Sequence, residues 1–114
     1  MTTQASKKIY FAILLITLFH SSIASAKCSA DLSRYVGWTI IYSGTVTGYI
    51  TDEGEEDSSF NGCEYGRRLI VDYTKQVTCQ TYSYSYAYHP DILILDNGSS
   101  REACIDGDMY AISN

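Results

Sequence analysis

Four cysteines constrain this chain more than any other feature, because the part expected to fold is short. Cys28, Cys63, Cys79 and Cys104 all lie downstream of residue 26. A domain of fewer than about 100 residues has a small hydrophobic core, and an even number of cysteines in an exported chain of this size predicts disulfides. We therefore expect two disulfide bonds. Cysteine spacing leaves three pairings open, of which we prefer Cys28–Cys63 with Cys79–Cys104.

The first 26 residues have the three parts of a secretory signal peptide. Lys7 and Lys8 precede an apolar run over residues 9–19, and residues 24–26 are the small Ala-Ser-Ala of a cleavage site. The apolar run is shorter than the roughly 20 residues that a membrane-spanning helix needs. We expect cleavage after residue 26, which leaves a single secreted or periplasmic domain over 27–114 with no membrane anchor.

The predicted mature chain is acidic. Six basic residues remain after cleavage, against thirteen acidic ones, for a net charge of −7 with His89 neutral. Such a charge repels phosphate backbones and anionic lipid, so we expect no nucleic-acid partner, whereas a basic partner would suit it. Arg67 and Arg68 form a basic pair that we interpret as ordinary surface residues.

The cysteine and histidine pattern does not favour a metal site. No two cysteines have the C-x₂-C or similar spacing that zinc sites use, and His89 is the only histidine after residue 26. We therefore expect no metal and no cofactor.

The distribution of β-branched, aromatic and turn-forming residues predicts an all-β domain. About six or seven short strands are expected, separated by turns every 8–12 residues or so. No segment is long enough for crossover helices, so the sheet should be mainly antiparallel. A small disulfide-stapled barrel or sandwich fits this spacing. The predicted strands are residues 37–50, 67–72, 77–88, 92–95, 103–105 and 109–112.

Two of these segments leave details open. Gly44 and Gly48 interrupt residues 37–50, and a glycine within a strand indicates a bulge or a sharp bend. Two strands with a break near Gly44, or one strongly coiled strand, both fit. Residues 73–76 are expected to form the hairpin loop before the strand 77–88.

A row of alternating tyrosines is the most unusual pattern in the chain. Tyr82, Tyr84, Tyr86 and Tyr88 alternate with small residues, so all four rings would share one face of a strand. Exposed, they would form a recognition strip for a protein or for sugar rings. We expect instead that they are partly buried, because a small domain poor in leucine and phenylalanine must fill its core with other side chains.

Residues 51–59 predict a second candidate surface. This segment has no apolar residue, and we interpret it as a solvated loop that could attract a basic partner. Its oxygen-bearing side chains do not have the alternating spacing of a calcium loop. The five acidic residues of the loop are Asp52, Glu53, Glu55, Glu56 and Asp57.

Catalysis finds little support in the sequence. His89 would have to serve any histidine-dependent mechanism, but it precedes Pro90 in a predicted turn, and no G-x-S-x-G motif is present. Glu64, Asp72 and Glu102 are possible hydrolytic carboxylates, yet so small a domain rarely has a deep cleft. We expect no enzyme activity, with a small hydrolase as the least favoured alternative.

These observations favour an exported, non-enzymatic binding protein that acts on another protein as an inhibitor, immunity or effector-type module. The alternative is a carbohydrate-binding or cell-wall-binding module that uses the tyrosine row. A self-assembling structural subunit is a further alternative.

Overall fold

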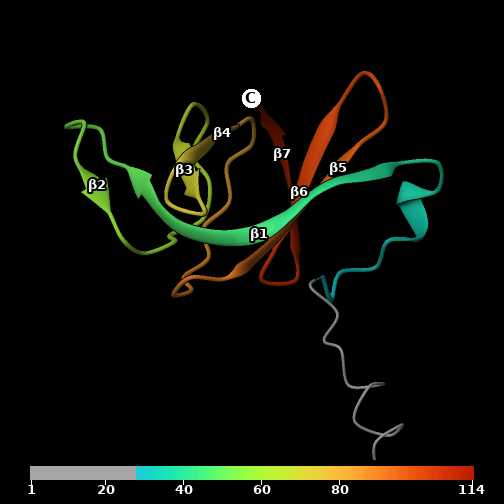
Figure 1. Cartoon of the computed structure of the whole chain (residues 1–114), viewed down its shortest axis with the longest axis horizontal. Helices are drawn as coiled ribbons and strands as arrows, with labels where there is room; N and C mark the ends of the chain where they lie inside the picture. The colour runs from blue at the N-terminus through green and yellow to red at the C-terminus, as the bar shows by residue number, and fades with distance from the viewer. Residues whose placement is uncertain (1–27) are drawn as a thin grey trace, which may run out of the picture.

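The computed structural model describes residues 28–114, which form an antiparallel β-barrel (Figure 1). The sheet order is β2-β1-β3-β4-β7-β6-β5, and a further pairing of β1 with β5 closes a ring of six strands with β2 outside it. The expected all-β fold is thus confirmed, as a barrel. A short 3₁₀ turn, Ser33–Tyr35, precedes the first strand. The strands are β1 Thr39–Ile50, β2 Glu56–Asp57, β3 Arg68–Val71, β4 Lys75–Cys79, β5 Asp91–Asp96, β6 Arg101–Ile105 and β7 Asp108–Ser113.

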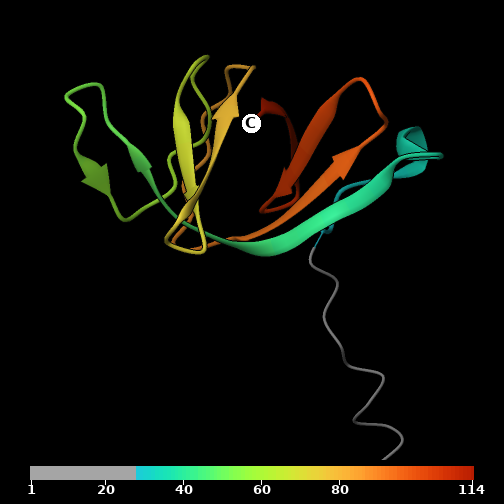
Figure 2. The same ribbon diagram turned by 45° about the horizontal axis from the view of Figure 1, so that its top comes forward.

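Strand β1 is a single coiled strand that belongs to both halves of the barrel. Residues 39–45 pair with β5, and residues 46–49 pair with β3. Figures 1 and 2 show β1 as one long curved ribbon with β3 and β4 above one end and β5 to β7 above the other. One of its two register shifts lies between Val46 and Gly48, as the glycine predicts, whereas Gly44 stays in regular register with β5.

Gly44 does not mark a bulge. It lacks a side chain where the Asp72 carboxylate approaches β1 closely. A Cβ atom at Gly44 would lie 2.4 Å from Oδ2 of Asp72. The Tyr42 hydroxyl donates a hydrogen bond to this carboxylate, and the Thr45 backbone N–H donates to its other oxygen at 3.0 Å. The hydrogen bond from Tyr42 to Asp72 raises the pKa of the phenol. The absent side chain of Gly44 therefore leaves room for the carboxylate that connects β1 to the β3–β4 turn.

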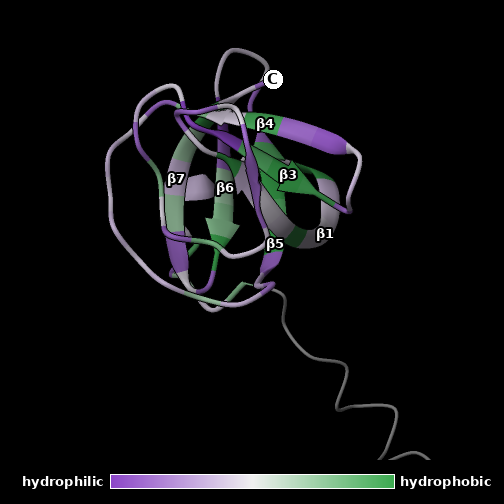
Figure 3. Cartoon of the chain, turned by 90° about the vertical axis from the view of Figure 1, so that its left-hand side faces the viewer, coloured by the Kyte–Doolittle hydropathy of each residue, from purple (hydrophilic) through white to green (hydrophobic). Residues whose placement is uncertain are grey.

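The barrel interior is filled by aliphatic residues and two buried aromatic rings. Phe60 and Tyr110 meet edge to face with ring centroids 5.8 Å apart. Figure 3 shows hydrophobic stretches on the barrel strands and mainly hydrophilic or neutral loops around them. The best-buried aliphatic residues are Val46, Leu69, Val71, Ile92 and Ile105.

Both expected disulfides are present, but the preferred pairing is wrong. The bonds are Cys28–Cys104 and Cys63–Cys79, with Cα–Cα distances of 5.8 and 5.5 Å. Cys63 precedes the β3–β4 hairpin and Cys79 ends it, so the hairpin itself brings the two cysteines together. Two structural disulfides indicate an oxidising compartment.

Residues with positive φ form the turns of two hairpins. Asp106 and Gly107, both at positive φ, form the two-residue turn between β6 and β7. The turn predicted at residues 73–76 is displaced, because Asp72 and Tyr73 adopt positive φ and Lys75 already belongs to β4.

The long strand expected over residues 77–88 is also wrong, because β4 ends at Cys79. Residues 80–90 then connect β4 to β5. The predicted signal peptide and its cleavage site lie outside the described residues. Within residues 28–114, no helix is long and apolar enough to cross a membrane.

The two disulfides should contribute unequally to stability. Replacing Cys28 and Cys104 with alanine removes a link across a sequence separation of 76, and replacing Cys63 and Cys79 removes one across 16. Each cross-link lowers the entropy of the denatured chain, so its removal raises that entropy and should destabilise the fold by about 4.5 and about 3 kcal/mol, respectively. Urea unfolding of the two double variants measures the difference. The reverse order would show that native packing around the cysteines dominates, and peptide mapping without reduction checks the pairing itself.

Candidate functional site

The four alternating tyrosines lie on the outside of the molecule, so the expectation that they are partly buried is wrong. Tyr82, Tyr84, Tyr86 and Tyr88 are 77%, 79%, 62% and 70% exposed. Ala87 between them packs against the core cluster. The rings therefore point outward, whereas Ser85 and Ala87 between them are half-buried and Ser83 is exposed. We refer to these four residues as the tyrosine strip.

Two isolated β-bridges hold the strip against residues 60–63. Phe60 and Ala87 exchange two backbone hydrogen bonds of 3.0 Å, and Cys63 and Ser83 exchange bonds of 2.7 and 2.9 Å. Three residues of the strip segment, 84–86, lie opposite only two, 61 and 62, which is the arrangement of a β-bulge. This bulge explains why an alternating sequence does not form a regular strand here.

Gly62 allows the strip to approach so closely. It is buried and has a φ of +82°, and an added Cβ atom would lie 2.1 Å from the Ser83 carbonyl oxygen and 2.9 Å from Cα of Tyr84. Only glycine suits both the left-handed backbone and the short distance. The left-handed residue Gly62 is therefore also the contact that positions the strip.

The inward face of the strip lies beside the buried Tyr110. Burial raises the pKa of the Tyr110 phenol, the Asp108 carboxylate raises it further, and the Ser85 and Ser83 hydroxyls lower it. These small hydroxyl side chains thus provide polar surroundings for a phenol that reaches the end of the core. Three of the rings also have neighbours on the outer surface, because Tyr88 stacks on His89 and both Tyr82 and Tyr84 line a groove beside residues 61–67.

A polar groove of about 370 Å³ lies along one end of the strip. One lining residue is Arg67, whose guanidinium carbon lies 4.6 Å from the Tyr49 ring centroid and whose Nη2 lies 3.4 Å from Oε2 of Glu64. Arg67 Nη1 also donates to the Gly62 carbonyl at 3.3 Å. The groove is lined by Tyr49, Asn61, Cys63, Glu64, Arg67, Tyr82, Ser83 and Tyr84.

The acidic loop continues from this groove. A neighbouring hollow of about 220 Å³ is lined by Thr51, Asp52 and Glu53 together with the same Tyr49 and Arg67. The two surfaces that the sequence predicted separately therefore meet at one arginine and one tyrosine. Sequence reasoning missed Arg67, because nothing in an Arg-Arg pair shows which of the two faces a groove.

The loop prediction is correct for most of its acidic residues. Asp52, Glu53, Glu55 and Glu56 are exposed, but Glu56 and Asp57 form the short strand β2 beside the end of β1. The Asp57 carboxylate accepts hydrogen bonds from the Ser59 hydroxyl and the Ser59 N–H, which lower its pKa. Asp57 is therefore engaged locally, and the other four carboxylates are the ones presented to solvent.

The residues considered for catalysis have separate contacts. His89 stacks on Tyr88 with ring centroids 4.1 Å apart and meets the Tyr73 ring edge to face. Glu64 pairs with Arg67, and Glu102 accepts a hydrogen bond from the Tyr35 hydroxyl at 2.7 Å. Within residues 28–114, no group of three histidine, cysteine or acidic side chains is arranged to hold a metal ion.

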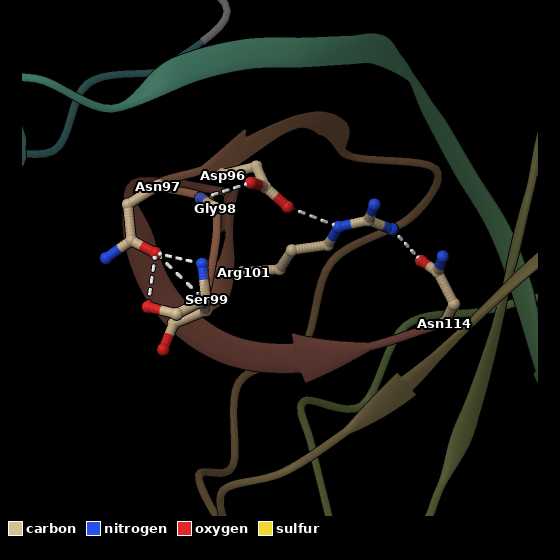
Figure 4. A network of polar contacts seen from close by, with 7 residues as sticks. Asp96, Asn97, Gly98, Ser99, Arg101 and Asn114 are labelled. Atoms are coloured by element: carbon tan, nitrogen blue, oxygen red, sulfur yellow. Dashed lines mark hydrogen bonds and ion pairs between the residues drawn. The ribbon is translucent and has the colours of Figure 1, made fainter.

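Another hollow, of about 470 Å³, lies elsewhere, beside the β5–β6 turn. Figure 4 shows its polar residues bound to one another: Arg101 Nε donates to Asp96 at 2.6 Å, and Arg101 also donates to Asn114. Asp96 accepts from the Gly98 N–H, and Asn97 accepts from the Ser99 N–H at 2.9 Å. These contacts fix the turn and the end of β7, so we assign this network a structural role.

Comparison of the chain with protein-family models, with curated proteins and with solved structures finds no match. The candidate site is therefore defined by this chain's own geometry. It comprises the tyrosine strip, the Arg67 groove and the exposed part of the acidic loop.

Gly62→Ala should disturb the strip, and Gly54→Ala is the matched control. Both glycines have φ near +82°, so both alanines carry a left-handed backbone cost of about 1–2 kcal/mol. Only Gly62→Ala adds a clash with the strip backbone, for which we expect at least about 1 kcal/mol more destabilisation. Thermal and urea unfolding of the two variants measure this difference. Equal destabilisation would show that the strip does not depend on the Gly62 contact.

Asp96→Asn should reduce stability in a pH-dependent way. The Arg101 hydrogen bond and the Gly98 N–H hold the pKa of Asp96 below its usual value. Its contribution is therefore complete above the unfolded-state pKa of about 3.9 and is lost as the pH falls through the lower folded-state value. Urea unfolding from pH 7 to pH 2 should show a constant gap between wild type and variant above about pH 5, and a shrinking gap below. A gap that did not change with pH would contradict this assignment.

Proposed function

We propose that this chain is a secreted or periplasmic, non-enzymatic binding protein that captures another protein through the tyrosine strip. The observation that carries the proposal is the exposure of four alternating rings on a segment whose backbone is fixed by two bridges and by Gly62. Inhibitor, immunity and effector-type modules are the functional classes that such a surface suits.

The energetics of recognition support this use of the rings. Tyrosine offers a large, rigid contact area with a polar tip, and it is common among the residues that dominate interface energies. A strip that is already held in place loses little conformational freedom on binding. Four large rings left in solvent by a domain of this size are therefore better explained by contact with a partner than by the barrel's own packing.

The acidic loop would act on the rate and specificity of capture. Its exposed carboxylates lie next to the groove at the end of the strip, in a chain whose net charge is −5 before signal cleavage. Exposed charges of one sign steer an oppositely charged partner and lose this effect at high salt. A basic partner fits the proposal best.

A carbohydrate or cell-wall ligand is the second candidate, and the Arg67 groove is the observation that favours it. The groove places the Tyr82 and Tyr84 side chains near hydrogen-bonding groups of Asn61, Glu64 and Arg67. Aromatic surface beside polar side chains is the combination that sugar rings require. The exposed tyrosines would then provide the apolar half of a sugar site.

Alanine at all four strip positions should abolish capture of a protein partner. Loss of a tyrosine hot spot typically weakens binding at least about 10-fold, so the fourfold variant should weaken it at least about 100-fold. Tyr65→Ala is the control, because Tyr65 is 74% exposed but lies outside the strip. Partners captured by wild type from extracellular or periplasmic fractions would be identified, and their affinity for each variant measured. Unchanged affinity of the fourfold variant would refute the proposal.

The sugar alternative makes a different prediction. Arg67→Ala should weaken retention on a glycan array or on peptidoglycan by about 10-fold or more, since a charged hydrogen bond contributes about 1.5–3 kcal/mol. Arg68→Ala is the matched control on the neighbouring, exposed position. No retention of wild type on either material would exclude this candidate and leave the protein-binding proposal untouched.

A further inference from the structure

The backbone of the tyrosine strip has one unpaired edge. Ser83 and Ala87 use their N–H and C=O groups to pair with residues 60–63. Each bridge uses the backbone groups of a small residue, and neither uses those of the tyrosines on either side. Among the hydrogen bonds of residues 28–114, none involves the backbone N–H of Tyr82, Tyr84 or Tyr86.

This edge differs from the edges of the six barrel strands and from the outer edge of β2, which is only two acidic residues long. Each of the six barrel strands pairs with a neighbour on both sides, because the ring is closed. Proteins commonly shorten, cover or charge an open edge, since it is a template for another strand. Here the edge is bordered instead by exposed tyrosines, and a negatively charged surface begins at its Tyr82 end.

We propose that an extended, basic segment of the partner protein adds to this edge as a β-strand. Its backbone would exchange hydrogen bonds with Tyr82, Tyr84 and Tyr86, and its alternate side chains would lie against the four rings. Its lysines or arginines would approach Asp52, Glu53 and Glu64 beside the groove. This inference rests on the proposed protein-binding function and names the mode of binding and the chemistry of the partner.

The negative charge of this chain favours a basic segment of another protein, and not a second copy of this chain, as the strand that adds to the edge. A copy would bring a further acidic loop and another net negative charge to the same surface. Like charges brought together at an interface cost several kcal/mol. Concentration-dependent dimerisation through the strip, seen by sedimentation, would therefore overturn the proposal.

The first test uses a ten-residue peptide of alternating lysine and valine, with a glutamate–valine peptide as control. Only the lysine peptide should bind, and its binding should weaken with added salt. Amide hydrogen exchange should then show new protection at Tyr82, Tyr84 and Tyr86, while Ser83 and Ala87 are protected already in the free protein. No binding up to millimolar peptide, or binding without that protection, would overturn the proposal.

The second test separates the backbone from the ring. Tyr84→Ala and Tyr84→Pro both remove the ring, but only proline removes the N–H. Loss of one hydrogen bond predicts about 3- to 10-fold weaker peptide binding by Tyr84→Pro than by Tyr84→Ala. Replacement of the amide that carries the Tyr86 N–H with an ester, which keeps the ring, should give a similar loss and guards against misfolding of the proline variant.

The outcomes distinguish the two proposals. Equal affinities for Tyr84→Ala and Tyr84→Pro, both below wild type, would reject strand addition but keep the strip as a side-chain binding surface. Unchanged affinity of the captured partner for both variants would count against the proposed function as well. Strand addition would be supported if Tyr84→Pro bound the peptide more weakly than Tyr84→Ala, and if the ester protein bound it more weakly than wild type.

Discussion

The structure depends on the backbone pairing of β1 with both β3 and β5. A single strand that changes neighbours midway makes one sheet close on itself, and the closed ring encloses the aliphatic core. Closure also determines where the rest of the chain can go. The connection from β4 to β5 must pass outside the barrel to reach the far side of β1, and this connection carries the tyrosines.

The candidate site is a consequence of that connection. Because β4 ends at Cys79, the following residues are free of the barrel's ladder, and they are positioned instead by residues 60–63. The Cys63–Cys79 bond joins the start of this route to the strand that supports it. Arg67 follows Cys63 after a tight turn, which brings the guanidinium under the strip and beside the Tyr49 ring.

Much of the fold was predictable, because its signals are local. Strands rich in β-branched residues, the Asp106-Gly107 turn and the even cysteine count each depend on neighbouring residues or on composition alone. The disulfide pairing and the end of β4 were not predictable, because both depend on which distant segments meet. Alternation over residues 82–88 correctly placed the rings on one face, but periodicity carries no information on whether that face meets core or solvent. The orientation depends on the bridges to residues 60–63 and on the Gly62 contact, which lie about twenty residues away in sequence, and no local pattern reveals them.

Neighbouring positions of the strip are under different constraints: the small residues contact the rest of the protein through their backbone, and the tyrosine rings are exposed. Ser83 and Ala87 are constrained by their backbone bridges to residues 60–63, whereas the ring positions are largely exposed and lie outside the core. Descendants of this chain could therefore exchange the rings for other side chains and acquire new specificities without refolding. The strip would then be a variable binding surface on a constant scaffold, and the chain would be a suitable starting point for a library of binding proteins.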